Sequence, residues 1–283
     1  MGCEQVDAYG RQLDMVEMSD IQDYYDKNTD IEWTRLAERH RTEYAVSLRA
    51  MKDYLPKPPA SVLDVGGGPG RYAITLASAG YAVTLADLSP ANLDFARSRA
   101  EEAGVALMGR HQVNALDLGR FEDRSFDAVL VMGPLYHLVT EADRSRAMRE
   151  AVRVLKPGGM LFAAFITRFS PFRDSAQGYP EWLAENWEYA LQLLETGVHE
   201  VGRGFTEAYF AHPREVEPLL RAVGLDTLVV IGCEGVVAGH EALINQLSGT
   251  AWERWVELNY RLGQDPATHG AADHLLAIGR KSG

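Results

Sequence analysis

The apolar residues of this chain recur with different periods in successive segments. Short runs rich in Val, Leu and Ala and bounded by Gly, Pro or Asp are typical of strands, whereas apolar residues spaced by three and four are typical of amphipathic helices. On this basis we predict seven strands, at Ser61–Val65, Ala82–Ala86, His111–Val113, Phe126–Met132, Met160–Ile166, Asp226–Cys233 and His274–Lys281.

The segments between these strands carry the helical period. One long helix is expected over 31–55, with His40 filling the one gap in its apolar stripe, and Pro56 would end it. Further helices are predicted over 71–79, from 90 to about 103, from 141 to about 155, around Leu191–Leu194 and around Trp252–Leu258, with Ser89 and Thr140 as N-caps. A turn is expected at Lys156–Gly159. Strands that alternate with helices indicate a mainly parallel sheet with right-handed crossovers, so the predicted fold class is α/β, doubly wound and Rossmann-like.

The charge and cysteine content restrict the classes of partner and site. The chain has 40 acidic and 28 basic residues, a net charge of −12, which disfavours binding to nucleic acid or to anionic membranes. No apolar run reaches the roughly 18 residues of a membrane-spanning helix, and the acidic N-terminal segment is unlike a secretory signal, so we expect a cytoplasmic protein. Cys3 and Cys233 lie far apart and show no metal-ligand spacing, so neither a disulfide framework nor a metal site is expected.

A glycine-rich loop between the first strand and the following helix is the strongest local feature. It contains Asp64, Gly66, Gly67, Gly68 and Gly70. Glycine lets a ligand approach the backbone closely, and ligands of open α/β sheets bind beyond the carboxyl ends of the strands. Asp87 follows the second strand at about the 20-residue spacing expected of a carboxylate that binds ribose hydroxyls. A tight turn without a ligand is the alternative interpretation.

The order of these residues resembles motif I of the class I S-adenosylmethionine-dependent methyltransferases, D-x-G-x-G-x-G. A dinucleotide fingerprint that starts at Gly66 would instead need a third glycine where Arg71 stands. Asn114-Ala115, Phe126-Asp127 and Leu155–Gly159 also resemble segments of the small-molecule branch of that family, which includes ubiquinone-biosynthesis-like methyltransferases.

This resemblance implies S-adenosylmethionine as the cofactor and a small molecule as the methyl acceptor. In the family the glycine loop packs against the methionine and ribose, and a carboxylate placed like Asp87 binds the ribose hydroxyls. The position of Asn114 commonly holds an Asp that contacts the adenine amino group, and Asn can still accept that hydrogen bond without charge. The implied cofactor-binding residues are Asp64, Gly66, Gly67, Gly68, Gly70, Asp87, Leu88, Asn114, Ala115, Met132 and Tyr25.

The resemblance further implies one methyltransferase domain over 1–283, built on a seven-stranded sheet. Residues 1–58 would form a helical N-terminal lid, and residues 59–166 the cofactor-binding core. Residues 167–204 would be a helical cap inserted after the fifth strand. Residues 205–283 would complete the sheet, with a helical insertion before the last strand.

The loop after the fourth strand carries the candidate catalytic residues, Tyr136 and His137. In the family this loop faces the transferring methyl group, so His137 is a candidate general base or acceptor-orienting residue. For His137 a backbone hydrogen bond is the alternative role, and for Tyr136 it is packing. Candidate substrate-binding residues, for which packing or helix capping is the alternative, are Tyr24, Trp33, Tyr179, Trp187, Tyr209 and His212.

The predicted function is therefore methyl transfer to a hydroxyl, amine or thiol of a small molecule. Two alternatives stay open at this point. One is a nicotinamide-dependent oxidoreductase built on the same sheet, and the other is a protein that binds S-adenosylmethionine without turnover. The oligomeric state is open as well, a homodimer included.

Overall fold

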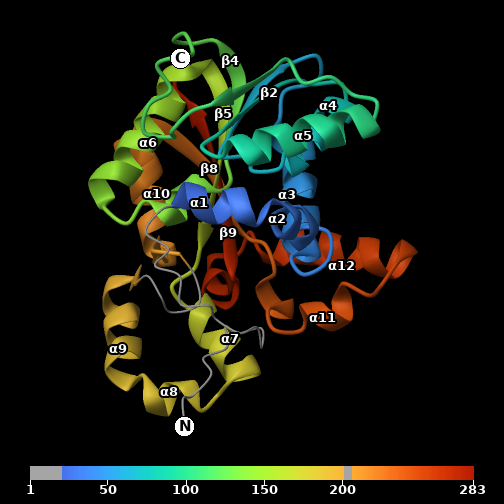
Figure 1. Ribbon diagram of the computed structural model, residues 1–283. Helices are drawn as coiled ribbons and strands as arrows, with labels where there is room; N and C mark the ends of the chain where they lie inside the picture. The colour runs from blue at the N-terminus through green and yellow to red at the C-terminus, as the bar shows by residue number, and fades with distance from the viewer. Residues whose placement is uncertain (1–20, 201–205) are drawn as a thin grey trace.

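The computed structural model describes residues 21–200 and 206–283, and its centre is a seven-stranded sheet (Figure 1). The sheet has the order β3-β2-β1-β4-β5-β9-β8. The first five strands pair in parallel, and β9 runs antiparallel to both β5 and β8. The strands are β1 (Ser61–Val65), β2 (Ala82–Asp87), β3 (Gly109–Gln112), β4 (Phe126–Val131), β5 (Leu155–Ile166), β8 (Leu225–Gly232) and β9 (His274–Lys281). The predicted mainly parallel, seven-stranded α/β fold is thus confirmed.

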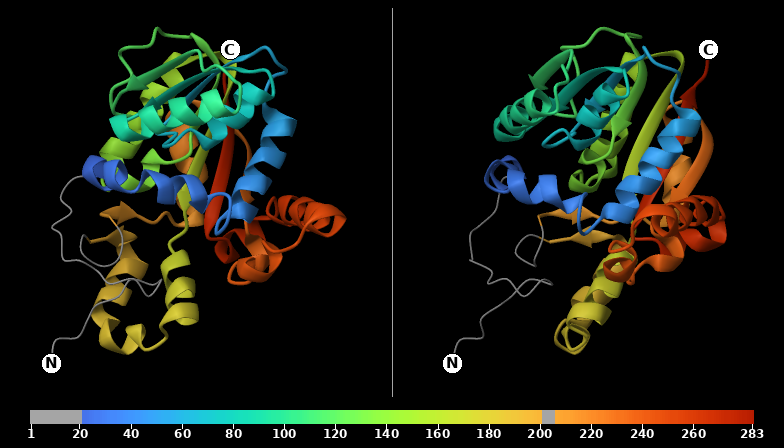
Figure 2. Two further views of the ribbon diagram at one scale, coloured as in Figure 1. Left: turned by 45° about the vertical axis from the view of Figure 1, so that its right-hand side comes forward. Right: turned by 90° about the vertical axis from the view of Figure 1, so that its right-hand side faces the viewer.

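Helices cover both faces of the sheet, which explains why its central strands are almost wholly apolar. Successive residues of β4 point to opposite faces, so Leu130 joins one core cluster and Val129 the other. On the face of Leu130 lie α3 (Arg41–Tyr54), α4 (Arg71–Ser78), α5 (Pro90–Glu102) and α12 (Gly249–Leu262), and on the other face lie α6 (Glu141–Val154) and α10 (Pro213–Ala222). Figure 2 shows these two helical layers on either side of the strands.

The predicted helix over 31–55 is wrong as a single element. The structure has α2 (Thr29–Arg35) and α3, separated by a turn in which the His40 N–H donates to the Arg35 carbonyl at 2.8 Å. His40 then serves as the residue before the first turn of α3 and does not fill a helical stripe. Leu36 stays buried in the turn although the chain changes direction there, so the apolar spacing continues across the break. The sequence pattern therefore does not reveal the break.

The predicted starts of α5 and α6 are confirmed. The Ser89 hydroxyl accepts a hydrogen bond from the Asn92 N–H, and the Thr140 hydroxyl accepts one from the Asp143 N–H. The turn expected at Lys156–Gly159 lies within β5, where the strand bulges between its pairings with Phe126 and Ala128.

Two further groups of elements lie at the carboxyl edge of the parallel strands. Helix α1 (Ile21–Lys27) runs across that edge and contacts α5. A helical segment after β5 extends away from the sheet, as Figure 1 shows. It comprises α7 (Ser170–Gly178), α8 (Trp182–Glu185), α9 (Trp187–Thr196) and a small sheet of β6 (Val198–His199) and β7 (Ala208–Tyr209), and the short helix α11 (Glu241–Ile244) precedes α12.

In the part of the chain that the structure describes, no helix combines the length and the apolar character that a membrane crossing requires. Cys233 is buried and free, and Cys3 lies outside the described residues. The predicted lid and cap, 1–58 and 167–204, also extend into residues outside the described ranges.

We expect Leu130→Ala to lower the free energy of unfolding by about 2–5 kcal/mol, because Leu130 is fully buried in β4 and its truncation leaves a cavity. Leu228→Ala on β8 is the matched control, since Leu228 is 40% exposed, and it should change this free energy by about 0.5 kcal/mol or less. Denaturant unfolding monitored by circular dichroism measures both. Equal effects of the two substitutions would contradict the assigned core.

Candidate functional site

The glycine loop is tightly enclosed at Gly66, Gly67 and Gly70, where a Cβ would clash with neighbouring side chains. Gly66, Gly68 and Gly70 have φ angles of +64°, +56° and +84°, in the left-handed region that glycine adopts without penalty. A Cβ on Gly66 would lie 2.7 Å from Pro134 Cδ, and one on Gly67 would lie 2.5 Å from Asp64 Oδ2. The loop therefore presents bare backbone at the carboxyl end of β1.

Asp87 at the end of β2 holds this loop in place. Its Oδ2 accepts a hydrogen bond from the Gly68 N–H at 2.8 Å, and its Oδ1 accepts from the Ser89 N–H at 2.9 Å and from Asn92 Nδ2 at 3.2 Å. Burial raises the pKa of Asp87, while the Ser89 and Gly68 N–H groups act in the opposite direction. A carboxylate has about four acceptor sites, so these three bonds leave capacity for a ligand hydroxyl while Asp87 also shapes the loop.

Asp64 is a buried carboxyl group that needs a partner. It is fully buried in β1, and neither of its oxygens makes a hydrogen bond to any residue that the structure describes. Burial and the neighbouring Asp87 raise the pKa of Asp64 to about 7. Buried polar groups are normally paired, so an ammonium or other donor placed beside the glycine loop would satisfy Asp64. Together with the bare backbone, this unsatisfied carboxyl fits an adenosyl amino acid such as S-adenosylmethionine.

His137 lies between two hydroxyl groups from distant parts of the chain. It ends the 3₁₀ helix Pro134–His137 that follows β4. Its Nε2 lies 2.6 Å from the Tyr25 hydroxyl of α1, and its Nδ1 lies 3.1 Å from the Thr206 hydroxyl. Burial lowers the pKa of His137 to about 4, so the imidazole is neutral at pH 7 and can accept a hydrogen bond from a hydroxyl.

The other candidate catalytic residue, Tyr136, remains a phenol at neutral pH. It is buried, and its ring lies 4.6 Å from the His137 ring. Burial raises the pKa of Tyr136 to about 12, with Arg35 acting in the opposite direction. Tyr136 can therefore orient a ligand or pack against His137, but it is not a base.

Helix α1 connects the two sides of the site. At one point its Asp26 accepts hydrogen bonds from the Ser89 hydroxyl and from the Ala91 N–H, the latter at 3.3 Å. These donors belong to the start of α5, where a carboxylate is favoured by the helix dipole. One residue earlier, Tyr25 reaches His137. The helix thus spans the mouth between β2 and β4.

The structure places the remaining predicted cofactor residues around the same edge. Asn114 is exposed, and its side-chain oxygen accepts a hydrogen bond from the Leu116 N–H at 2.9 Å. Met132 is buried at the end of β4, and Leu88 follows Asp87 with its carbonyl bonded to Gln112. Ala115 is half-buried after β3.

The six predicted substrate-binding residues do not form one group. Trp33 packs against Phe95 and under the Arg71 guanidinium, 4.3 Å from the ring centre, so it attaches α2 to α4 and α5. Tyr24 makes an edge contact with Tyr25. His212 caps α10 by accepting a hydrogen bond from the Arg214 N–H, which supports the capping interpretation.

Tyr209 lies on β7, which packs against the 3₁₀ helix that carries His137. The Tyr209 hydroxyl donates to Glu215 and accepts from Arg168, and the Arg144 guanidinium stacks on its ring at 3.5 Å. Tyr179 and Trp187, on the segment α7 to α9, are 44% and 52% exposed. Both side chains are thus exposed, and their contact with an acceptor stays a prediction.

Two positioning residues were missed in the sequence. Thr206 contacts His137 from a point 69 residues away, and no local pattern marks it. Arg144 of α6 donates to the carbonyls of Leu138 and Val139 at 2.8 and 2.6 Å and so supports the loop that carries His137. Arg144 is only 8% exposed, and the many charged residues of α6 gave no indication of this burial.

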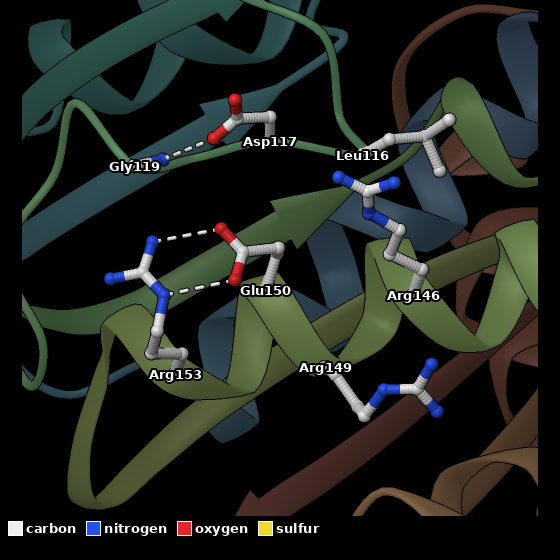
Figure 3. Close-up of a pocket in the computed structure, with 7 residues that line it drawn as sticks. All are labelled: Leu116, Asp117, Gly119, Arg146, Arg149, Glu150 and Arg153. Carbon is white, nitrogen blue, oxygen red and sulfur yellow. Dashed lines mark hydrogen bonds and ion pairs between the residues drawn. The ribbon is translucent and has the colours of Figure 1, made fainter.

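Two cavities flank this edge of the fold. The larger, about 730 Å³, lies between the turn before α3, α7 and α11, and is lined by mixed charges that include Arg39, Asp174, Glu241 and Asp273. The smaller, about 320 Å³, lies between α6 and the loop after β3 (Figure 3). There Arg153 pairs with Glu150, and the predicted site residues do not line it.

Comparison with known proteins gives one consistent picture. A family model described as a methyltransferase domain matches residues 63–163. The ubiquinone biosynthesis O-methyltransferase of Methylobacterium nodulans is 32% identical over 213 residues, which cover 75% of this chain and 74% of that protein. The protein of the same name from Methylocella silvestris is 32% identical over 175 residues, and the match spans 61% of its length.

Solved structures agree on the fold. A SAM-dependent methyltransferase from Methanosarcina mazei has a TM-score of 0.55 and 21% identity, with 82% of this chain and 97% of that chain covered. A SAM-dependent methyltransferase from Thermotoga maritima has a TM-score of 0.56 and 21% identity, with 93% and 100% covered. These comparisons favour the methyltransferase interpretation over the nicotinamide-dependent oxidoreductase.

We expect Asp87→Asn to weaken binding of S-adenosylhomocysteine by roughly tenfold to a hundredfold, because the amide would place a donor against the N–H groups that Asp87 now accepts from. Isothermal titration measures the affinity. Asp94→Asn on the exposed face of α5 is the matched control and should bind as the unchanged protein does, since the Asp94 side chain is 73% exposed. Unchanged affinity in Asp87→Asn would contradict the assigned site.

We expect His137 to stay neutral as the pH falls from about 6.5 toward 4 in the ligand-free protein, because its pKa in the folded chain is about 4 while an unfolded chain takes up the proton near pH 6.5. In this pH window the unfolded chain therefore binds more protons than the folded chain. As a result, His137 lowers the free energy of unfolding as the pH is lowered. Proton NMR of the His137 ring follows the titration directly.

Tyr25→Phe should move the His137 pKa back toward 6.5, because loss of the hydroxyl admits water to Nε2. Tyr24→Phe, one residue away on α1, is the control that leaves this contact in place. A His137 titration that is the same in both variants would contradict the role of α1 as its cover.

Proposed function

Because this chain belongs to the class I S-adenosylmethionine-dependent methyltransferases, we propose that it methylates a hydroxyl group of a small molecule, with His137 binding the acceptor. The curated relatives are named as O-methyltransferases, and the neutral His137 suits a hydroxyl acceptor better than a cationic amine. The match covers only part of those relatives, so their particular acceptor is not carried over.

One contact supports this proposal above the others. The Tyr25 phenol lies 2.6 Å from His137 Nε2, and a phenol ordinarily donates to a neutral imidazole. An acceptor hydroxyl in the place of the Tyr25 hydroxyl would make the same hydrogen bond to His137 Nε2. We infer that an acceptor displaces Tyr25 from His137 when α1 opens.

The cofactor-binding residues follow from the geometry of the glycine loop. We propose that the backbone of Gly66–Gly70 lies against the cofactor, that Asp64 faces its amino group and that Asp87 binds a ribose hydroxyl. Bound there, S-adenosylmethionine supplies a methyl group already activated on a sulfonium. The chain's own part is then to align the acceptor, exclude water and receive a proton.

His137 is proposed to receive that proton. The acceptor hydroxyl would lose its proton to Nε2 as its oxygen takes up the methyl carbon, while the carbon–sulfur bond of the sulfonium would break and leave a neutral thioether. Thr206 at Nδ1 holds the ring orientation, and Arg144 holds the loop. Tyr136, with its pKa raised to about 12, remains protonated and is proposed to orient the acceptor rather than to act as a base.

Several finer assignments stay as proposals. Tyr24 lies next to Tyr25 on α1 and would border the acceptor when this helix opens. Tyr179 and Trp187 would contact an acceptor only if the segment α7 to α9 moved toward the sheet. A cytoplasmic location, a homodimer and the absence of nucleic-acid partners likewise remain predictions, as do the boundaries of lid, core and cap.

We expect His137→Gln to lower kcat for methyl transfer to a phenolic acceptor by about 10²–10⁴-fold, the range for loss of a general base, with little change in the affinity for S-adenosylhomocysteine. Transfer of radiolabelled methyl to a set of small phenols, alcohols, amines and thiols measures the activity. His240→Gln replaces an exposed histidine and is the control.

Activity that is unchanged in His137→Gln would remove His137 from the mechanism. Transfer to amines or thiols alone would contradict the hydroxyl acceptor. Tight cofactor binding without any methylated product would instead support the alternative of a binding protein without turnover.

A further inference from the structure

Four side chains, three of them buried, converge beside the start of β9, and the proposed methyl transfer does not use them. They are His40 before α3, Glu43 in its first turn, Glu234 after β8 and His274 at the start of β9. Each offers one potential ligand atom, and these four atoms lie within 4.8 Å of one another. Glu43, Glu234 and His274 are 5%, 1% and 6% exposed.

The polar partners of this cluster are incomplete. Glu234 is well satisfied, because it accepts from the His274 ring at 2.6 Å and from the His274 N–H at 2.9 Å. Glu43 Oε2, by contrast, has no hydrogen bond to any described residue, and it lies 3.7 Å from His274 Nδ1 and 3.8 Å from His40 Nδ1. These distances are too long for hydrogen bonds.

A buried carboxylate oxygen without a partner is costly. The His274 ring lies between the two carboxylates, with its Nδ1 2.6 Å from Glu234 Oε1 and 3.7 Å from Glu43 Oε2. The ring therefore hydrogen-bonds Glu234 and leaves Glu43 Oε2 without a hydrogen bond. A cation among the four side chains would give this oxygen a partner.

The cluster is also accessible. His40 lines the cavity of about 730 Å³, whereas the other three side chains lie behind it. The His40 ring makes an edge contact with the His274 ring, and the two ring centres lie 5.2 Å apart. An ion could therefore reach the cluster through the cavity, and one side of the ion's coordination shell would face the cavity.

We propose that His40, Glu43, Glu234 and His274 bind a divalent transition-metal ion. Two imidazoles and two carboxylates are a ligand set that suits Zn²⁺, Mn²⁺ or Fe²⁺. A tetrahedral site with bonds of about 2.1 Å needs ligand atoms about 3.4 Å apart, so the side chains must contract around the ion. This site is separate from the glycine loop, and the proposal does not depend on methyl transfer.

The ion would connect three segments of the chain. His40 and Glu43 lie at the start of α3, just after the N-terminal helices α1 and α2, whereas Glu234 follows β8 and His274 begins β9. Metal binding would thus join the N-terminal helices to the far side of the sheet and would order one wall of the cavity.

The experiment is a zinc titration of the full chain after removal of metal by a chelator. Isothermal titration with Zn²⁺ and elemental analysis after desalting should show about one ion per chain, and the midpoint of thermal unfolding should rise on adding Zn²⁺. His40→Ala and Glu43→Gln should each weaken Zn²⁺ binding at least tenfold.

Matched controls separate the cluster from its surroundings. His240→Ala removes an exposed histidine, and Glu241→Gln changes a carboxylate that lines the cavity but does not belong to the cluster. Both should bind Zn²⁺ as the unchanged protein does. Circular dichroism shows that each variant is folded.

No stoichiometric Zn²⁺ in the unchanged protein would overturn the proposal, as would cluster variants that bind as tightly as the controls. Binding of S-adenosylhomocysteine is measured in parallel. Because the cofactor site does not include these residues, loss of Zn²⁺ with retained S-adenosylhomocysteine binding distinguishes failure of this proposal from failure of the proposed function.

Discussion

The hydrogen bond from the Gly68 N–H to Asp87 is the interaction on which the site depends. It joins the loop after β1 to the end of β2 at 2.8 Å, and the Gly66 N–H adds a second link to the Ala86 carbonyl at 2.7 Å. These bonds hold the left-handed glycines in one conformation, which keeps bare backbone at the mouth of the sheet. Every proposed contact with the cofactor requires this geometry.

The carboxyl edge of the parallel strands also concentrates buried charge. Asp64 and Glu43 each carry an oxygen that no described residue satisfies, and a folded chain tolerates such groups mainly where a ligand completes them. The two residues lie in different elements, β1 and α3. The proposed partners are accordingly different, an ammonium group for Asp64 and a metal ion for Glu43.

Arg71 marks the difference between this glycine loop and the dinucleotide fingerprint. It stands where the dinucleotide fingerprint has its third glycine, a residue that allows close packing of helix on strand. Here the Arg71 guanidinium stacks on Trp33 of α2, so the position is used to attach the N-terminal helices. The same residue thus departs from the dinucleotide fingerprint and attaches α2 to α4.

The sequence by itself determined the seven strands of the main sheet, the glycine loop and the position of Asp87, because apolar period and glycine spacing are local properties that the sheet preserves. Only the tertiary structure decided the surroundings of His137, whose contact with Tyr25 joins residues 112 positions apart. It also decided the break before α3 and the convergence of His40 and Glu43 with Glu234 and His274. These contacts depend on how segments that are distant in the sequence pack together. The period of apolar residues does not indicate which of their side chains will face each other.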